Sequence, residues 1–143
     1  MAQEEKEMLI KDLCGRLPYG VMVQVNDVAR GIYDRRLVQV FCDRVSCSVN
    51  VCNPLKECIC IDSVKPYLRP MSSMTEKENL SLAEFVGVHV SARHGEIYFP
   101  NLSDNTVCNW HKVFDWLNKK MFDYRGLIPA GLALETPEGI YNN

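Results

Sequence analysis

The sequence lacks the short motifs that identify the common enzyme classes. GxGxxG, GxxxxGKS or GxxxxGKT, HExxH and GxSxG are all absent from its 143 residues. These patterns mark dinucleotide-binding, phosphate-binding, metalloprotease and hydrolase sites, respectively. Their absence does not exclude an enzyme, but it removes the usual grounds for proposing one. We therefore expect no enzymatic activity and no cofactor.

Long apolar runs and a strong excess of one charge are also missing. No segment reaches the roughly 18 apolar residues that a membrane-spanning helix needs, and the acidic start MAQEEKEMLIKDL is not typical of a secretion signal. The formal net charge is -2, so the field of the whole molecule does not attract nucleic acid or an anionic membrane. We expect a cytoplasmic protein that does not engage a membrane.

Cysteine is abundant, with seven residues, but no two cysteines form the CxxC pair that is typical of structural zinc sites. Five cysteines lie in the strand-like region after Gly20: Cys42, Cys47, Cys52, Cys58 and Cys60. Without an export signal, an odd number of thiols favours reduced, mostly buried cysteines over a disulfide framework. Zinc held by neighbouring strands is the alternative, and we expect no metal site.

The first half of the chain changes from a helical pattern to a strand pattern. Apolar residues at helical spacing predict a helix over residues 4–16, which Gly15 and Pro18 end. After Gly20, apolar and polar residues alternate in VMVQV, RLVQVF and VSCSVNV, and ECICI follows as a fourth strand. Short strands separated by turn residues predict a small antiparallel barrel or meander.

The segment KPYLRP, residues 65–70, predicts the last strand of this barrel. Lys65 and Arg69 each precede a proline and are therefore biased toward extended backbone. Pro66 cannot donate a ladder hydrogen bond, which predicts that the strand lies at an edge or begins there. A strand, one helical turn at IDSV and a short last strand resemble the close of an SH3-like barrel, a likeness of fold that implies no function.

The second half predicts two helices and a hairpin. Thr75 and Glu78 match a capping box before a helix from about Glu76 to Phe85. VGVHV and EIYFP, joined by SARHG, predict a β-hairpin. N-caps at residues 103–105 predict a second helix. Its apolar face comprises Val107, Trp110, Val113, Phe114, Leu117 and Met121.

Together these elements predict an α+β fold. An N-terminal helix and an SH3-like β-barrel occupy residues 1–70, and a helix-hairpin-helix region occupies residues 71–143. The barrel contains few large apolar residues, so we expect the two halves to share one core. Trp110, Phe114 and Trp116 are expected to contribute to that core.

One series of residues has the chemistry of a nucleophilic site. Cys108 and His111 lie three apart on the second predicted helix, and Asp115 lies four beyond His111. Such spacing lets a thiol, an imidazole and a carboxylate approach one another on one helix. All three come from a single helix with no evident oxyanion site, so a coincidence of helical spacing is the preferred interpretation.

The remaining candidates are surfaces. Lys65, Tyr67 and Arg69 are expected to project from one face of the last barrel strand. Two cations around an aromatic ring can hold phosphate and stack a base, so nucleic-acid binding is the second hypothesis; a solvated outer face is its alternative. The leading hypothesis is a non-enzymatic interaction module that binds a protein partner through the barrel edge and the FDYRGL segment. The candidate residues of that segment are Phe122, Asp123, Tyr124 and Arg125.

Two stretches of the chain carry a family resemblance. KPYLRPMSSMT (Lys65–Thr75) and the FDYRGLI, GLALE and PEG motifs within Asp115–Tyr141 resemble a group of short proteins of gut anaerobes and their phages or mobile elements. Members of that group combine these motifs with a variable β-rich first half. The cysteine-rich strands of this chain depart from the group, which argues against a shared metal role. The resemblance implies an intracellular accessory protein of phage origin, and it carries over no activity, cofactor or catalytic residue.

Overall fold

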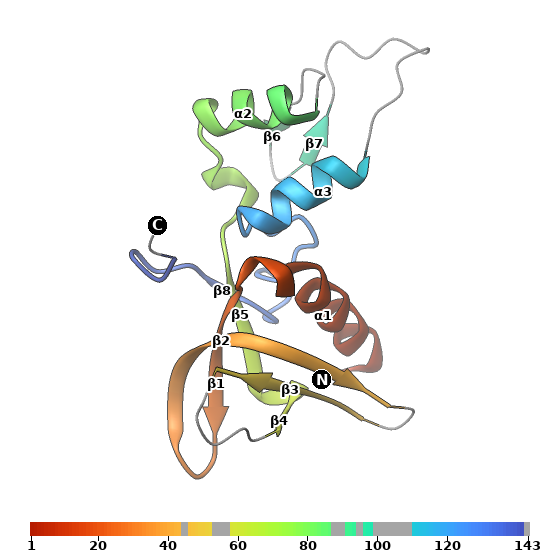
Figure 1. The fold of residues 1–143 in the computed structure, drawn as a ribbon, viewed down its shortest axis with the longest axis vertical. Helices are drawn as coiled ribbons and strands as arrows, with labels where there is room; N and C mark the ends of the chain where they lie inside the picture. Colours follow the sequence, from red (N-terminus) through yellow and green to blue (C-terminus); the bar gives the residue numbers. More distant parts are fainter. Residues whose placement is uncertain (44–45, 53–57, 87–90, 94–95, 99–109, 142–143) are drawn as a thin grey trace. The chain divides into compact units, whose positions relative to one another are not determined.

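The computed structural model describes residues 1–43, 46–52, 58–86, 91–93, 96–98 and 110–141. In these ranges the protein is α+β, with three α-helices, a six-stranded sheet and a two-stranded hairpin (Figure 1). The α+β class predicted from the sequence is therefore confirmed.

The chain divides into two compact units. The first contains Met1–Leu68 and Arg125–Asn143, and the second contains Arg69–Tyr124. The division after Leu68 lies close to residue 70, where the sequence predicts the change from barrel to helical region. The return of the chain to the first unit at Arg125 has no counterpart in the sequence pattern. The expectation that the two halves share one core stays a prediction.

The first unit consists of one helix and a single sheet. Its elements are α1 (Gln3–Arg16), β1 (Met22–Asp27), β2 (Gly31–Cys42), β3 (Cys47–Val51), β4 (Cys58–Cys60), β5 (Val64–Leu68) and β8 (Leu134–Glu135). One 3-10 turn, Leu17–Tyr19, follows α1, and another, Ile61–Ser63, joins β4 to β5. The predicted helix, the predicted strands and the helical turn before the last strand are thus present.

The sheet is open and is not the closed SH3-like barrel that the sequence predicts. The strand order is β4-β3-β2-β1-β5-β8, and all pairs are antiparallel except β5 with β8. Closure would require the end strands to pair with each other. Among the described residues, β4 pairs only with β3 and spans three residues, while β5 pairs with β1 and β8.

The position of Pro66 also differs from the prediction, because β5 is not an edge strand and begins before the proline, at Val64. Pro66 faces Val23 of β1, and β8 pairs with β5 only from Tyr67 onward. The C-terminal segment adds this parallel two-residue strand one residue beyond the proline. Pro66 therefore lies where β5 has a strand neighbour on one side, which is compatible with its missing N–H.

The core of the first unit follows the alternation of its strands. Val21, Val23 and Val25 are fully buried, while the residues between them are partly exposed. Leu9 and Leu13, one turn apart on α1, are fully buried as well. The same helix also buries an ion pair, because the Arg16 guanidinium donates to both carboxylate oxygens of Asp12 at 2.7 and 2.9 Å.

The second unit contains two helices, a hairpin and a 3-10 turn. Its elements are the turn Met71–Ser73, α2 (Glu76–Val86), β6 (Ser91–Arg93), β7 (Glu96–Tyr98) and α3 (Trp110–Lys119). The predicted capping box is confirmed: Thr75 Oγ1 accepts the Glu78 N–H at 3.1 Å, and Glu78 Oε1 accepts the Thr75 N–H at 3.3 Å. The hairpin is confirmed, but β6 occupies the segment predicted as its joint.

The core of the second unit is centred on the end of α3. It comprises Met71, Leu82, Val86, Val113, Trp116, Leu117 and Phe122. The rings of Trp116 and Phe122 stack with centroids 5.9 Å apart. The helix ends in a Schellman motif, in which Phe122 N–H donates to Leu117 C=O and Met121 adopts a φ of 61°. This turn directs Phe122 back into the core.

Trp110 and Phe114 are exposed, so their predicted core roles are wrong, whereas Trp116 is buried in the core of the second unit. The exposed fractions of Trp110 and Phe114 are 48% and 40%, against 5% for Trp116. The helix buries the stripe formed by Val113, Trp116 and Leu117, and the helical repeat places Trp110 and Phe114 beyond one side of that stripe. Their rings stack on one another instead, with centroids 6.1 Å apart.

Candidate functional site

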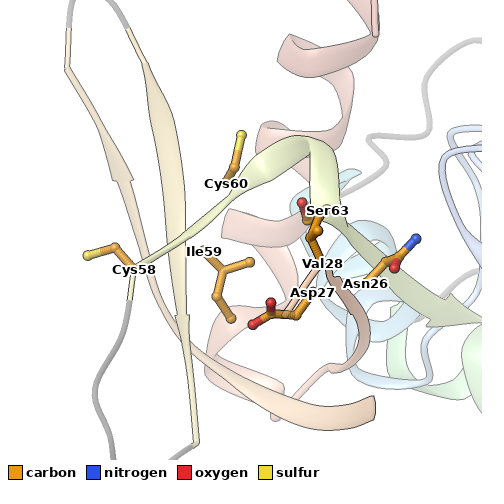
Figure 2. A pocket seen from close by; sticks show the side chains of 7 residues that line it. All are labelled: Asn26, Asp27, Val28, Cys58, Ile59, Cys60 and Ser63. Carbon is orange, nitrogen blue, oxygen red and sulfur yellow. The ribbon is translucent and has the colours of Figure 1, made fainter. Parts of the chain in front are cut away.

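A hollow of about 250 Å³ lies in the first unit, where β4 comes near the end of β1 (Figure 2). Seven residues line it: Asn26, Asp27, Val28, Cys58, Ile59, Cys60 and Ser63. They come from two segments that are 30 residues or more apart in the sequence. The 3-10 turn Ile61–Ser63 joins β4 to β5, and β5 pairs with β1, which places the two segments near each other.

The backbone of β4 borders this hollow. Cys58, Ile59 and Cys60 pair with Asn50, Val49 and Ser48 of β3, respectively. On its other side β4 has no strand neighbour in the described ranges. An edge strand presents backbone N–H and C=O groups along that side, and such a row can pair with an added strand.

The side chains around the hollow combine apolar and polar groups. Val28 is fully exposed at the β1–β2 turn, and Ile59 is half-buried. Figure 2 shows the Ile59 side chain directed to the side of β4 that faces Asp27, whereas the Cys60 thiol points to the opposite side. Asp27 is held in place because its Oδ1 accepts the Ala29 N–H at 2.8 Å. This arrangement can receive a small apolar side chain next to a carboxylate.

The three residues Lys65, Tyr67 and Arg69 do not form the shared exposed face that the sequence predicts. Lys65 is exposed, Tyr67 is buried and Arg69 is half-buried. Lys65 and Tyr67 belong to the first unit and Arg69 to the second. The alternation of the strand places Lys65 and Tyr67 on one face, but tertiary contacts cover the tyrosine.

The Tyr67 hydroxyl is the centre of a polar network. It donates to Asp34 Oδ1 at 2.7 Å and accepts from Gln24 Nε2 at 3.0 Å. Burial and the hydrogen bond to the Asp34 carboxylate raise the pKa of Tyr67 above its ordinary value. Since both partners lie on neighbouring strands β1 and β2, the network ties β5 to the sheet. Its geometry gives Tyr67 a structural role.

Arg69 contacts several residues of the second unit through both its side chain and its backbone. Its guanidinium donates to both Glu78 carboxylate oxygens at 2.7 and 2.8 Å, and it lies 4.2 Å from the centroid of the Phe122 ring. Its backbone N–H donates to Met121 and its C=O accepts from Asp123. The hydrogen bond from Arg69 lowers the pKa of Glu78. A half-buried cation with these contacts is poorly placed to hold a phosphate.

The FDYRGL segment is mostly, but not wholly, used in packing. Phe122 and Asp123 are buried, and the half-buried Tyr124 donates through its hydroxyl to Asn118 Oδ1 at 2.9 Å. Arg125 is exposed, and its Nε lies 3.6 Å from Asp12 Oδ1 in the first unit. The segment therefore divides between the two units, and of its four candidate residues only Arg125 is exposed.

The possible nucleophilic series lies in the second unit. Cys108, the predicted caps at residues 103–105 and Val107 lie outside the described residues. His111 and Asp115 are exposed on α3, and neither lines the described hollow. The two described members therefore lie on a solvent-facing part of the helix.

The prediction of mostly buried thiols is wrong. Of the six described cysteines, Cys47 is half-buried and the other five are exposed. Cys42 and Cys52 lie at or just beyond strand ends, and Cys58 and Cys60 lie on the edge strand, where few side chains surround them. In the described part of the chain, no group of three or more His, Cys, Asp or Glu side chains is arranged to hold a metal ion.

Two residue sets were missed in the sequence. The hollow depends on turn residues such as Val28, whose exposure no periodic pattern reveals. The buried pair Asp12–Arg16 did leave a signal, because both residues lie on the same side of the helix as Leu9 and Leu13. Opposite charges four residues apart within an apolar face indicate a buried ion pair.

No family model matches the chain, and no curated protein or solved structure is significantly similar to it. Within the residues that the structure describes, none of the helices has the length and apolar character needed to cross a bilayer.

Proposed function

We propose that this protein is a non-enzymatic interaction module that binds an extended segment of a partner protein along the free side of β4. The observation that supports this proposal is the open sheet: β4 has one strand neighbour among the described residues and lies beside a hollow. Adding a strand to an exposed sheet edge is a recurring mode of peptide recognition, in which backbone hydrogen bonds provide affinity.

The hollow would provide specificity. Alternate side chains of an added strand point to the same face, so one of them would enter the space between Ile59 and Val28. That side chain would be small and apolar, and a basic neighbour would be favoured by the Asp27 carboxylate. Because β4 has only three residues, the ladder would be short. We expect a transient complex with a dissociation constant on the order of micromolar.

Selection from a random peptide library tests this function. Peptides would be selected on the full chain and then measured against Val28→Asp, which places a charge at the hollow. Ile32→Asp is the matched control, because Ile32 is also an exposed apolar residue near the β1–β2 turn but does not line the hollow. We expect Val28→Asp to weaken binding at least about tenfold, or roughly 1.4 kcal/mol, and Ile32→Asp to leave it unchanged. Equal loss in both variants, or no selected peptide, would refute the proposal.

Nucleic-acid binding is the second candidate function, and one observation favours it. Arg35 and Arg36 are exposed on β2, and the Arg35 guanidinium lies 5.2 Å from the centroid of the Tyr33 ring. Such a group can contact phosphate and a base together. Binding of short single strands at low salt is the test, compared with Arg35→Ala and Arg36→Ala. An affinity that these substitutions do not change would remove this alternative. A cytoplasmic location and an accessory role in mobile elements stay predictions from the sequence.

A further inference from the structure

Two thiols meet at the closed end of the β2–β3 hairpin. Cys42 is the last residue of β2 and Cys47 the first of β3, and they face each other in the antiparallel register. Their sulfur atoms are 2.7 Å apart. No other pair of the exposed cysteines in the described ranges is linked by such a contact.

The backbone explains why these side chains meet. The Asp43 N–H donates to the Ser46 C=O at 3.0 Å, which makes Asp43 and Ser46 the hydrogen-bonded pair nearest the turn. Hydrogen-bonded and non-hydrogen-bonded pairs alternate along an antiparallel ladder. Cys42 and Cys47 are therefore a non-hydrogen-bonded pair, whose Cα atoms are about 4.5 Å apart in ordinary sheets and whose side chains lie closest. That spacing is within the range that a disulfide bridges.

We propose that Cys42 and Cys47 form a reversible disulfide by exchange with a small-molecule disulfide such as oxidised glutathione, and that the pair is a redox-responsive link across the β2–β3 hairpin. Cys42 is exposed and Cys47 half-buried, so a small disulfide can reach the pair. A disulfide bond is about 2.05 Å long, so the sulfur atoms would approach each other by only about 0.6 Å.

The two thiols have different parts in the exchange. The hydrogen bond with Cys47, followed by burial and repulsion from neighbouring groups, raises the pKa of Cys42 to about 11. A raised pKa leaves less thiolate at Cys42, so we assign the first attack to Cys47. The Cys47 thiolate attacks one sulfur of oxidised glutathione, which forms a mixed disulfide and releases one glutathione thiolate.

The second step closes the protein disulfide. Cys42 attacks the Cys47 sulfur of the mixed disulfide, and the second glutathione leaves as a thiolate. The proton of Cys42 passes to one released glutathione thiolate, and the proton that Cys47 lost to solvent before its attack is balanced by protonation of the other. In total, two protein thiols are oxidised by two electrons, and one oxidised glutathione is reduced to two glutathione thiols.

The disulfide would restrain β3, the strand that pairs with β4. Cys47 adjoins Ser48, and Ser48 faces Cys60 of β4 in the sheet. Oxidation would restrain the end of the hairpin next to this pair. The proposal concerns the thiols alone and does not depend on peptide binding at β4.

Trypsin digestion and mass spectrometry test the link directly. The full chain is equilibrated in glutathione buffers of increasing oxidised fraction, and free thiols are then blocked with N-ethylmaleimide. Cleavage after Arg36, Arg44 and Lys56 separates Cys42 from the peptide that contains both Cys47 and Cys52. We expect these two peptides to be joined through a disulfide, with a loss of about 2 Da relative to the sum of the reduced peptides.

The variants identify the linked residues. Cys47→Ser and Cys42→Ser should each abolish the joined peptides, whereas Cys52→Ser, at the other end of β3, should retain them. The oxidised wild-type chain should melt on the order of 5 °C above its reduced form, and Cys47→Ser should lose this difference. Joined peptides that persist in Cys47→Ser, or thiols that are all blocked singly at every glutathione ratio, would overturn the proposal.

Discussion

At one end of the six-stranded sheet, the C-terminal segment is fastened to the sheet and to α1; at the other end, β4 has one strand neighbour in the described part of the chain. At the fastened end, the Thr136 N–H donates to Leu68 C=O at 2.8 Å, and the Tyr141 hydroxyl joins β1 and β5. Arg125 adds an ion pair with Asp12 of α1. Long-range polar contacts therefore stabilise the β8 end, whereas β4 has no second strand neighbour in the described part of the chain.

The largest expected effect concerns the ion pair that anchors α1 and the C-terminal segment. Arg16→Met leaves Asp12 buried without its bidentate partner, and both side chains are fully buried in the wild type. We expect the free energy of unfolding to fall by about 3–5 kcal/mol, as measured by urea denaturation. Lys6→Met on the same helix is the control. It removes an ion pair between the half-buried Lys6 and the exposed Asp62 and should cost less than about 1 kcal/mol.

The next effect concerns the hydroxyl of Tyr141. It accepts the Met22 N–H at 2.9 Å and donates to Tyr67 C=O at 2.9 Å. Tyr141→Phe keeps the ring but leaves both backbone groups without this partner. We expect a loss of about 2 kcal/mol in urea denaturation. A loss below about 0.5 kcal/mol would mean that the C-terminal segment contributes little to the stability of this end.

The same tyrosine predicts a dependence on alkaline pH. Burial raises the pKa of Tyr141 to about 12, whereas a tyrosine in the unfolded chain ionises near pH 10. The pKa of Tyr141 is higher in the folded chain than in the unfolded chain. The protonated Tyr141 therefore contributes fully to the free energy of unfolding below about pH 10, and this contribution is lost as the pH rises toward 12. The total loss is on the order of 2–3 kcal/mol. Because other groups also titrate there, the test is the difference between wild type and Tyr141→Phe, which should shrink across this interval.

The smallest expected effect lies at the β4 end. Val28→Asp changes a fully exposed side chain beside the hollow, so it should alter the free energy of unfolding by less than about 0.5 kcal/mol. Substitutions at the β8 end should therefore weaken stability, whereas Val28→Asp at the β4 end should weaken only peptide binding. A large loss of stability in Val28→Asp would instead give the hollow a structural role.

Local sequence patterns predicted most of the helices and strands, but they did not predict that the sheet is open. The alternation in VSCSVNV and the reciprocal caps of Thr75 and Glu78 depend on neighbouring residues, and the structure contains both β3 and the capping box. By contrast, β8 is two residues long and pairs with residues more than 60 positions earlier. No local pattern reveals such a strand, so neither the position of β5 nor the open sheet could be predicted.

The candidate site was predictable only in part. The edge of the β-rich region was expected to bind a partner, but the residues beside β4 come from turns whose exposure depends on tertiary structure. For Tyr67, the position on a strand was predicted, but its exposure was not. Its hydroxyl is hydrogen-bonded to Asp34 and Gln24 within the sheet. For Trp110 and Phe114, apolar character alone did not reveal which side of α3 is buried.

Amide hydrogen exchange at residues 58–60 would show whether a bound peptide pairs with β4. The full chain would be measured alone and with a library-selected peptide, and Val28→Asp with the same peptide would be the control. If the peptide adds a strand to β4, at least one amide of residues 58–60 exchanges rapidly in the free chain and slowly in the complex, and Val28→Asp shows little slowing. Unchanged exchange at all three amides, with slowing confined to the second unit, would contradict the account.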